Sequence, residues 1–179
     1  MGLAKKYQPP PRTGMEVFRM LPEGTLAELL NDSIHMSPAP NYHHQKLIFE
    51  LLLLIGGYVK KNKLGDCLQA PVDVFLDERN VVQPDILIIL AERMTILTDE
   101  GQIKGAPDFI IEVLSPGNKK YDTEKKKTLY EKFGVKEYFI IDPDNKEVIT
   151  YYAVNKKFVK QVSVKGKLKS KLLKKVFSF

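Results

Sequence analysis

The chain has 179 residues, a length that suits a single compact domain, and 44% of them are hydrophobic, enough to form a buried core. Its longest nearly apolar stretch, residues 51–59, is far shorter than the ~20 residues that a membrane span needs. The single cysteine, Cys67, excludes an internal disulfide and a cysteine-rich zinc cluster. We therefore expect a globular, cytoplasmic protein that does not bind membranes.

The formal net charge of +6 is distributed unevenly. Residues 148–179 carry nine lysines and no acidic residue, whereas acids slightly outnumber basic residues in the rest of the chain. A lysine-rich segment attracts polyanions such as DNA through the release of counterions. Lysines on exposed strands also prevent edge-to-edge aggregation. The second interpretation is the simpler one, so charge alone does not establish DNA binding.

The first third of the chain predicts a lead-in, a hairpin and a helix. Residues 1–24, with a proline-rich start, are expected to be a flexible lead-in to one domain at residues 25–179. Residues 26–36 should form a hairpin, because the turn-favouring pair Asn31 and Asp32 divides two apolar runs. Apolar residues then recur every three or four positions across residues 42–63, which predicts an amphipathic helix.

The middle of the chain has the composition of β-strands. Residues 67–76 alternate in part between apolar and polar, and residues 81–90 form an almost continuous apolar run. Residues 91–104 contain the breaks expected of a loop or helical turn, and residues 109–114 are again a buried strand pattern. Continuous apolar runs of this length favour central strands of a sheet.

The last third adds one helix and further strands. Residues 122–133 have helical spacing, with Gly134 at the expected C-cap position. Residues 138–141 form a third short apolar strand, and residues 148–154 and 158–164 should form a hairpin. The order of elements predicts an α/β fold, a mixed β-sheet with few helices.

Two carboxylates interrupt the apolar strands. Asp85 and Glu112 have almost only apolar neighbours in the sequence, and a carboxylate in such a place requires a cation, a hydrogen-bond network or a metal. If the two strands are neighbours, both side chains can supply oxygen ligands to Mg²⁺. Asp108 would share the strand face of Glu112, because an even offset preserves the side of the sheet. The simpler alternative is that Asp85 caps a turn and Glu112 pairs with a lysine.

The following helix offers a cation to this site. Asp122, Lys126 and Tyr130 recur every four residues and therefore share one helical face. From that face Lys126 could reach the carboxylates and offset charge on a phosphate. The competing interpretation is a solvated basic face formed by Lys119, Lys120, Lys125, Lys126, Lys127 and Lys132.

Four motifs follow one another in a distinctive order: Pro84-Asp85-Ile86, APDFIIEVLSP at residues 106–116, Asp122-x3-Lys126-x3-Tyr130, and GVKEYFIIDP at residues 134–143. Together with the Glu-Leu hairpin at residues 27–34 and Ser37-Pro38 with His44-Gln45, they resemble the Uma-two family of putative restriction endonucleases. That family belongs to the PD-(D/E)XK nuclease superfamily. The resemblance covers residues 25–155.

The resemblance implies a restriction-endonuclease-like mixed sheet flanked by helices, and metal-dependent hydrolysis of phosphodiester bonds in DNA. Asp85 and Glu112 would be catalytic residues and ligands of Mg²⁺, with Mn²⁺ as the second candidate. Leu114 stands where the superfamily motif has lysine, and in the family this role is assigned to the next helix, here to Lys126. Restriction-like enzymes often act as dimers, so a homodimer is also expected by analogy.

Three residues are secondary candidates. Asp108 would bind a second metal or order the start of its strand. The family pattern adds Glu28 and His44, although local sequence favours a surface position for Glu28 on the hairpin. For His44, local sequence favours a short-range hydrogen bond at the start of the helix.

Two other functions compete with hydrolysis at a metal site. One is a nucleic-acid-binding or regulatory protein that keeps the nuclease fold and cuts nothing, since a fold does not guarantee chemistry. The other is a hydrolase with a side-chain nucleophile. That alternative is weak, because Ser115 is outside a Gly-x-Ser-x-Gly motif and Cys67 has the surroundings of a buried strand residue.

Overall fold

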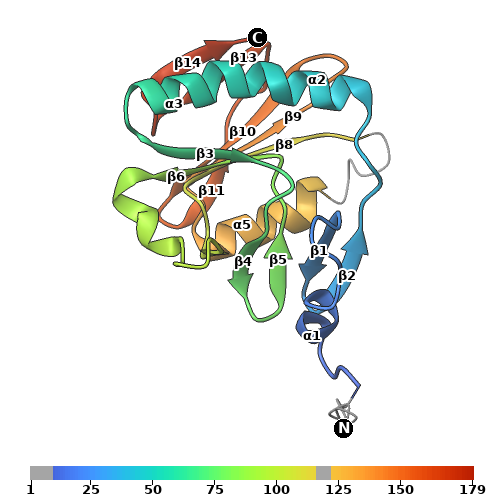
Figure 1. The fold of residues 1–179 in the computed structure, drawn as a ribbon. Helices are drawn as coiled ribbons and strands as arrows, with labels where there is room; N and C mark the ends of the chain where they lie inside the picture. Colours follow the sequence, from blue (N-terminus) through green and yellow to red (C-terminus); the bar gives the residue numbers. More distant parts are fainter. Residues whose placement is uncertain (1–9, 116–121) are drawn as a thin grey trace, which may run out of the picture.

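A seven-stranded sheet forms the centre of the protein in a computed structural model that describes residues 10–115 and 122–179 (Figure 1). The strands run in the order β11-β10-β9-β8-β6-β3, and β12 pairs with β10 beside this path. Their bounds are β3 (Gly65–Gln69), β6 (Ile86–Leu90), β8 (Phe109–Val113), β9 (Glu137–Ile141), β10 (Glu147–Val154), β11 (Lys157–Lys160) and β12 (Val164–Lys165). Parallel and antiparallel pairs both occur, so the predicted mixed α/β fold is confirmed.

A second, five-stranded sheet has the order β2-β1-β5-β4-β7. Its strands are β1 (Ala27–Leu30), β2 (Ser33–Met36), β4 (Val74–Asp77), β5 (Asn80–Val82) and β7 (Ile103–Lys104). The predicted hairpin of β1 and β2 is confirmed, and both turn residues, Asn31 and Asp32, have the positive φ that a tight hairpin turn requires. The hairpin of β10 and β11 is confirmed as well.

Helices cover both faces of the central sheet (Figure 1). The predicted helix at residues 42–63 is confirmed as α2 (Tyr42–Leu51), the π-helical turn η1 (Leu52–Gly56) and α3 (Gly57–Lys61). On the other face lie η3 (Asp122–Lys126) and α5 (Lys127–Phe133), and Gly134 caps α5 in the predicted left-handed conformation, with φ 83°.

Side chains of β8 alternate between these two layers. Phe109, Ile111 and Val113 pack toward α2, whereas Ile110 packs toward α5. Glu112 is two residues from Ile110 and therefore faces the α5 side. The alternation thus directs one carboxylate into the layer that holds the second sheet and α5.

The apolar run at residues 81–90 forms two strands in two sheets rather than one continuous strand. β5 ends at Val82 and β6 begins at Ile86. Pro84, which has no N–H to donate to a sheet, stands in the break. The break places Asp85 at the end of a strand, where its side chain reaches a solvent-accessible cleft.

The N-terminal lead-in is shorter than predicted. Within residues 10–24, α1 (Gly14–Phe18) begins with a capping box between Thr13 and Glu16. Met15 and Phe18 are buried against the second sheet, so this segment belongs to the folded domain. Residues 1–9 lie outside the described part of the chain, as do Lys119 and Lys120 of the expected basic face.

The loop or helical turn expected after residue 90 begins as a 3-10 helix, η2 (Ala91–Ile96). One further feature was not predicted: the lysine-rich end of the chain forms a separate hairpin of β13 (Lys167–Ser170) and β14 (Lys175–Ser178). Tyr58 of α3 packs edge-on against Phe177, which anchors this hairpin beside the helix. Across residues 10–115 and 122–179, no helix is both long enough and apolar enough to cross a membrane.

Candidate active site

Strand pairing brings Asp85 and Glu112 opposite each other. β6 and β8 are antiparallel neighbours, with Ile86 paired to Ile111. The next pair outward along this register is residue 85 with residue 112, and opposed residues of antiparallel strands project to the same side. The two acids thus come from adjacent strands, as the sequence predicted.

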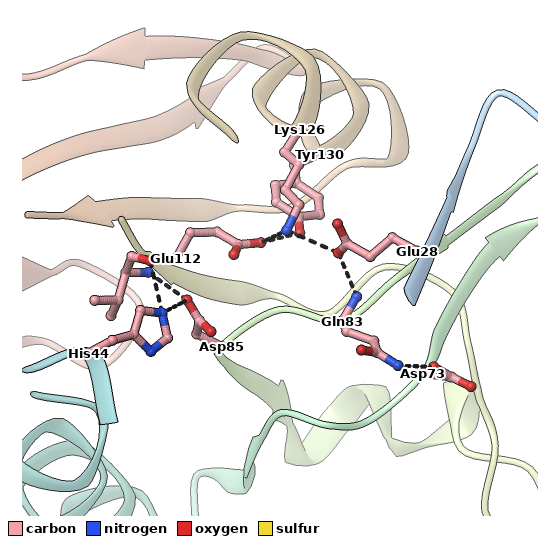
Figure 2. A network of polar contacts seen from close by, with 9 residues as sticks. Glu28, His44, Asp73, Gln83, Asp85, Glu112, Lys126 and Tyr130 are labelled. Atoms are coloured by element: carbon pink, nitrogen blue, oxygen red, sulfur yellow. Dashed lines mark hydrogen bonds and ion pairs between the residues drawn. The ribbon is translucent and has the colours of Figure 1, made fainter. Parts of the chain in front are cut away.

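Asp85 is held at the end of β8 by short contacts. Its Oδ2 accepts a hydrogen bond from the backbone N–H of Val113 at 2.7 Å. His44 Nε2 lies 3.3 Å from the same oxygen and 3.0 Å from the carbonyl oxygen of Val113. Because a carbonyl only accepts, Nε2 carries the proton. These contacts orient the Asp85 carboxylate toward the cleft beside β8 (Figure 2).

Glu112 is bound by two side chains of the covering helix. Its Oε1 lies 3.0 Å from Lys126 Nζ and accepts a hydrogen bond of 2.6 Å from the Tyr130 hydroxyl. Figure 2 shows both side chains reaching down from the helix to the carboxylate. Lys126 and Tyr130 are 5% and 0% exposed, so these contacts form away from bulk water and are stronger than surface pairs.

Glu28 completes the surroundings of Lys126. Its Oε1 lies 3.0 Å from Lys126 Nζ and accepts a hydrogen bond of 2.8 Å from the backbone N–H of Gln83. The Gln83 side chain donates in turn to Asp73 and to the carbonyl oxygen of Thr25. One ammonium group therefore bridges two buried carboxylates, one from each sheet.

A cleft of about 830 Å³ opens above these groups. Glu28, Asp85, Glu112 and Lys126 all contribute to its lining, together with His44 at the start of α2. Among the described residues that line it, three carboxylates stand against one lysine. The described lining of the cleft is therefore predominantly acidic.

Asp108, the third acid of the sequence motif, lies elsewhere. It is fully buried at the other end of β8, and its Oδ1 contacts Lys136 Nζ at 2.8 Å and Arg93 at 3.3 Å. Its Oδ2 accepts a hydrogen bond from the backbone N–H of Leu90. These contacts join β8 to β6 and fit the expectation that Asp108 orders the start of the strand.

Burial raises the pKa of two groups that matter for the chemistry of the site. Burial raises the pKa of Tyr130 well above its ordinary range, and the nearby charges of Glu112 and Glu28 raise it further. Tyr130 is therefore a permanent hydrogen-bond donor to Glu112. Burial also raises the pKa of the Cys67 thiol to about 12. A thiol that remains protonated is a poor nucleophile, which argues against a Cys67-dependent hydrolase.

Two interpretations from local sequence are wrong, and a third is incomplete. Glu28 is 7% exposed and is not a surface residue of the hairpin. The backbone N–H of His44 does make the expected local bond, to Asn41, but its side chain contacts Val113, 69 residues away. Lys126 is buried and does not belong to a solvated basic face. In each case the partner comes from a distant segment, so local spacing does not reveal it.

Two residues of the network were not selected as site residues from the sequence. Tyr130 follows Lys126 by one helical turn, and that spacing was the available signal. Gln83 has no comparable signal, because its role depends on the meeting of Glu28 and Asp73 in the fold.

The donor set of the cleft fits a hard divalent cation. Mg²⁺ prefers oxygen ligands, keeps several waters and is often bound through only one or two carboxylates. Asp85, Glu112 and the carbonyl oxygen of Val113 offer such oxygens beside the cleft. Over residues 10–115 and 122–179, no group of three or more His, Cys, Asp or Glu side chains is arranged as a metal site. Oxygen donors suit Mg²⁺ or Mn²⁺ better than a structural zinc ion, which prefers cysteine and histidine ligands.

Comparison with known proteins agrees with this geometry. The model of the Uma2 family, described as putative restriction endonucleases, matches residues 15–178. The chain belongs to the Uma2 family. The match includes both sheets, the covering helices and the C-terminal hairpin, so the resemblance seen over residues 25–155 extends to nearly the whole chain.

A solved structure shares the fold of this Uma2 protein. It is the crystal structure of a putative nuclease belonging to DUF820 from Anabaena variabilis ATCC 29413, with a TM-score of 0.69 and 23% sequence identity. The match covers 86% of this chain and 83% of that chain. At this identity the likeness demonstrates the fold alone. No match was found among curated proteins.

Proposed function

We propose that this protein is a metal-dependent endonuclease that hydrolyses phosphodiester bonds of DNA, with Asp85, Glu112 and Lys126 as its catalytic residues. The observation that carries the proposal is the meeting of Asp85 and Glu112 at one cleft, with the Lys126 ammonium 3.0 Å from Glu112. Family membership supports the reaction class.

Asp85 and Glu112 would hold Mg²⁺ or Mn²⁺, with the Val113 carbonyl as a further oxygen donor. When bound, a divalent ion offsets charge on the phosphate and lowers the pKa of a water molecule. The acidic lining of the cleft supports the need for a divalent cation, because one lysine cannot balance the charge of three carboxylates and a phosphate. Removal of divalent ions should therefore abolish substrate binding in the cleft as well as cleavage.

Lys126 would supply a fixed positive charge beside the scissile phosphate. Its ammonium is already ordered by Glu28 and Glu112, so little reorganisation is needed during the reaction. Tyr130 positions Glu112, and His44 positions Asp85, each through a buried hydrogen bond or close contact. These two are positioning residues, since their contacts go to the carboxylates.

DNA binding outside the cleft would involve the lysine-rich C-terminal segment. All nine of its lysines are exposed on β11, β12, β13, β14 and the intervening turns. Polyanion binding by such a surface weakens steeply with added salt. Salt dependence of DNA affinity, compared between the intact protein and a variant with Lys167, Lys169 and Lys171 changed to Gln, measures this contribution.

The decisive experiment incubates purified protein with supercoiled and linear DNA in Mg²⁺ or Mn²⁺, beside EDTA controls. We expect cleavage that EDTA stops and that Asp85→Ala and Glu112→Ala each abolish, with a smaller or similar loss for Lys126→Ala. Glu92→Ala, which removes an exposed acid outside the cleft, is the matched control.

Two results would contradict the proposal. Cleavage that survives both acid substitutions would point to another site or a contaminant. Salt-sensitive DNA binding without cleavage in either metal would support the alternative function, a DNA-binding protein that keeps the nuclease fold.

A further inference from the structure

The long helix over the central sheet exposes apolar side chains on the side that faces away from the protein. The continuous helix of α2, η1 and α3 lies on the central sheet (Figure 1). Its Leu47, Leu51 and Ile55 pack into the core against that sheet. On the opposite side, Phe49 is 62% and Leu53 63% exposed. The side of a surface helix that faces water normally carries polar residues, so an apolar outer side indicates an interaction surface.

This surface has a central line of three residues at four-residue spacing, Phe49, Leu53 and Gly57. Gly57 is exposed, and a Cβ added to it would meet nothing within 4 Å. The line therefore contains a large side chain, a medium one and a gap, each one helical turn from the next. Tyr42, 71% exposed, extends it toward the N-terminus, and Leu54 flanks it.

We propose that this helix face binds the same face of a second copy of the chain, with the two helices antiparallel and crossing at Leu53. Under two-fold symmetry both copies use one patch, which must be complementary to itself. An antiparallel crossing at Leu53 sets Phe49 of each copy over the partner's Gly57. Phe49, the largest side chain of the line, then fills the space at Gly57, which has no side chain. The dimer contains two such contacts.

The register that sets Phe49 over Gly57 also sets Lys46 opposite the partner's Lys60, and Glu50 lies beside this pair. Glu50 pairs with its own Lys46 at 3.9 Å, across a full helical turn. In the antiparallel dimer, Glu50 comes opposite position 56, and the partner's Lys60 lies one turn further along. Each Glu50 then lies between its own Lys46 and the partner's Lys60. Its negative charge offsets the repulsion between these two lysines.

The exposed area is also of the right order. Aromatic side chains present about 200 Å² each, so the exposed parts of Tyr42, Phe49, Leu53 and Leu54 amount to about 400 Å² of apolar surface per copy. Specific interfaces begin near 600 Å² per partner, of which a little over half is apolar. The patch with its charged flanks reaches this size for two copies.

The mass of the protein in solution tests the proposal directly. Sedimentation equilibrium on the wild-type chain should give twice the chain mass of 20.4 kDa. Leu53→Glu and Gly57→Trp should each weaken dimerisation at least tenfold, since the first buries two facing charges and the second fills the gap. Val162→Glu, at a position that is 88% exposed away from this helix, should leave the mass unchanged. Circular dichroism melting confirms that each variant is folded.

Cross-linking tests the position of the symmetry axis. The natural thiol Cys67 stays protonated because burial raises its pKa to about 12, so Leu53→Cys introduces the reactive thiol of the chain. Mild oxidation should convert Leu53→Cys to a covalent dimer and leave Val162→Cys monomeric on a denaturing gel. A wild-type monomer at every concentration, or a dimer that persists in Leu53→Glu, would overturn the proposal. Neither result depends on nuclease activity.

Discussion

Asp108 and Glu112 occupy the two ends of β8 and offer a direct comparison. Both carboxylates are buried, both face the same side of the sheet, and both contact a lysine within 3.0 Å. Asp108, however, is enclosed by Arg93, Lys136 and the Leu90 N–H, whereas Glu112 lines a cleft and stands opposite Asp85. A buried ion pair is therefore not enough to mark an active site. Access from solvent and a second acid from a neighbouring strand distinguish the two ends.

The largest effect is expected for Glu112→Gln. The substitution keeps the side-chain volume and removes one metal-binding charge, so the rate of DNA cleavage should fall by at least about 100-fold. The same variant should lose the increase in melting temperature that Mg²⁺ or Mn²⁺ produces in the wild type. Asp108→Asn should retain that increase. An unchanged response to metal in Glu112→Gln would place the cation elsewhere.

The two lysines that contact β8 sharpen the comparison. Lys126→Met should reduce cleavage by about 10- to 100-fold, because it leaves Glu28 and Glu112 facing each other without their cation. Lys136→Met should leave the rate unchanged and cost at most about 1 kcal/mol of stability, since its side chain is 41% exposed and Arg93 remains. Cleavage rates and urea unfolding of both variants provide the measurement. Equal losses of activity would remove the distinction between the two ends.

Asp108→Ala should affect stability rather than catalysis. It leaves the buried N–H of Leu90 without its acceptor and removes the partner of Arg93 and Lys136, at a cost of about 2 to 3 kcal/mol. Urea unfolding measures this loss. The cleavage rate per folded molecule should change by less than about twofold, which corresponds to a change in activation free energy smaller than RT. A loss of activity without a loss of stability would make Asp108 part of the metal site.

Another buried carboxylate, Glu137, gives the smallest effect. It accepts hydrogen bonds from Ser170 and from the backbone of Lys171 and Leu172, yet burial outweighs these contacts and raises its pKa. The folded state therefore binds a proton more tightly than the unfolded state, so its contribution to stability is lost as pH rises through the folded pKa.

Glu137→Gln removes this titration. The difference in unfolding free energy between wild type and variant should change in disfavour of the wild type as pH rises from about 4, the ordinary range of a glutamate, toward neutrality. Urea unfolding at a series of pH values measures it. A difference that is constant with pH would show that Glu137 has an unperturbed pKa.

Periodic patterns predicted most of the elements correctly. The helix at residues 42–63, the hairpins at residues 26–36 and 148–164 and the capped helix before Gly134 all rely on local turn chemistry or on one buried face. The hairpin of β13 and β14 escaped prediction, because its lysines hide a short alternation in which Leu168 and Phe177 are the buried residues. The apolar run at residues 81–90 does not reveal its division into β5 and β6, since residue periodicity does not distinguish two strands in different sheets.

The residues of the candidate site also divide into those that local sequence indicates and those that it does not. Asp85 and Glu112 could be selected from sequence, because a carboxylate within an apolar run always requires an explanation. Lys126 was suggested by helical spacing and by family resemblance, and Glu28 and His44 by the resemblance, while local context suggested exposed or locally bonded positions. Each has its decisive partner on another element, at a separation that no sequence window includes.

From the sequence alone, the order of most of the elements, the mixed sheet and the two strand acids were already determined, because burial patterns and turn residues act within a few positions. Only the tertiary structure decided that Glu28 and Glu112 share one ammonium group and that Asp108 is closed off from the cleft. Strand register and the placement of α5 set those contacts. The energy of a buried charge depends on the groups that surround it in space. Those groups come from distant segments, so the local sequence around each residue does not identify them.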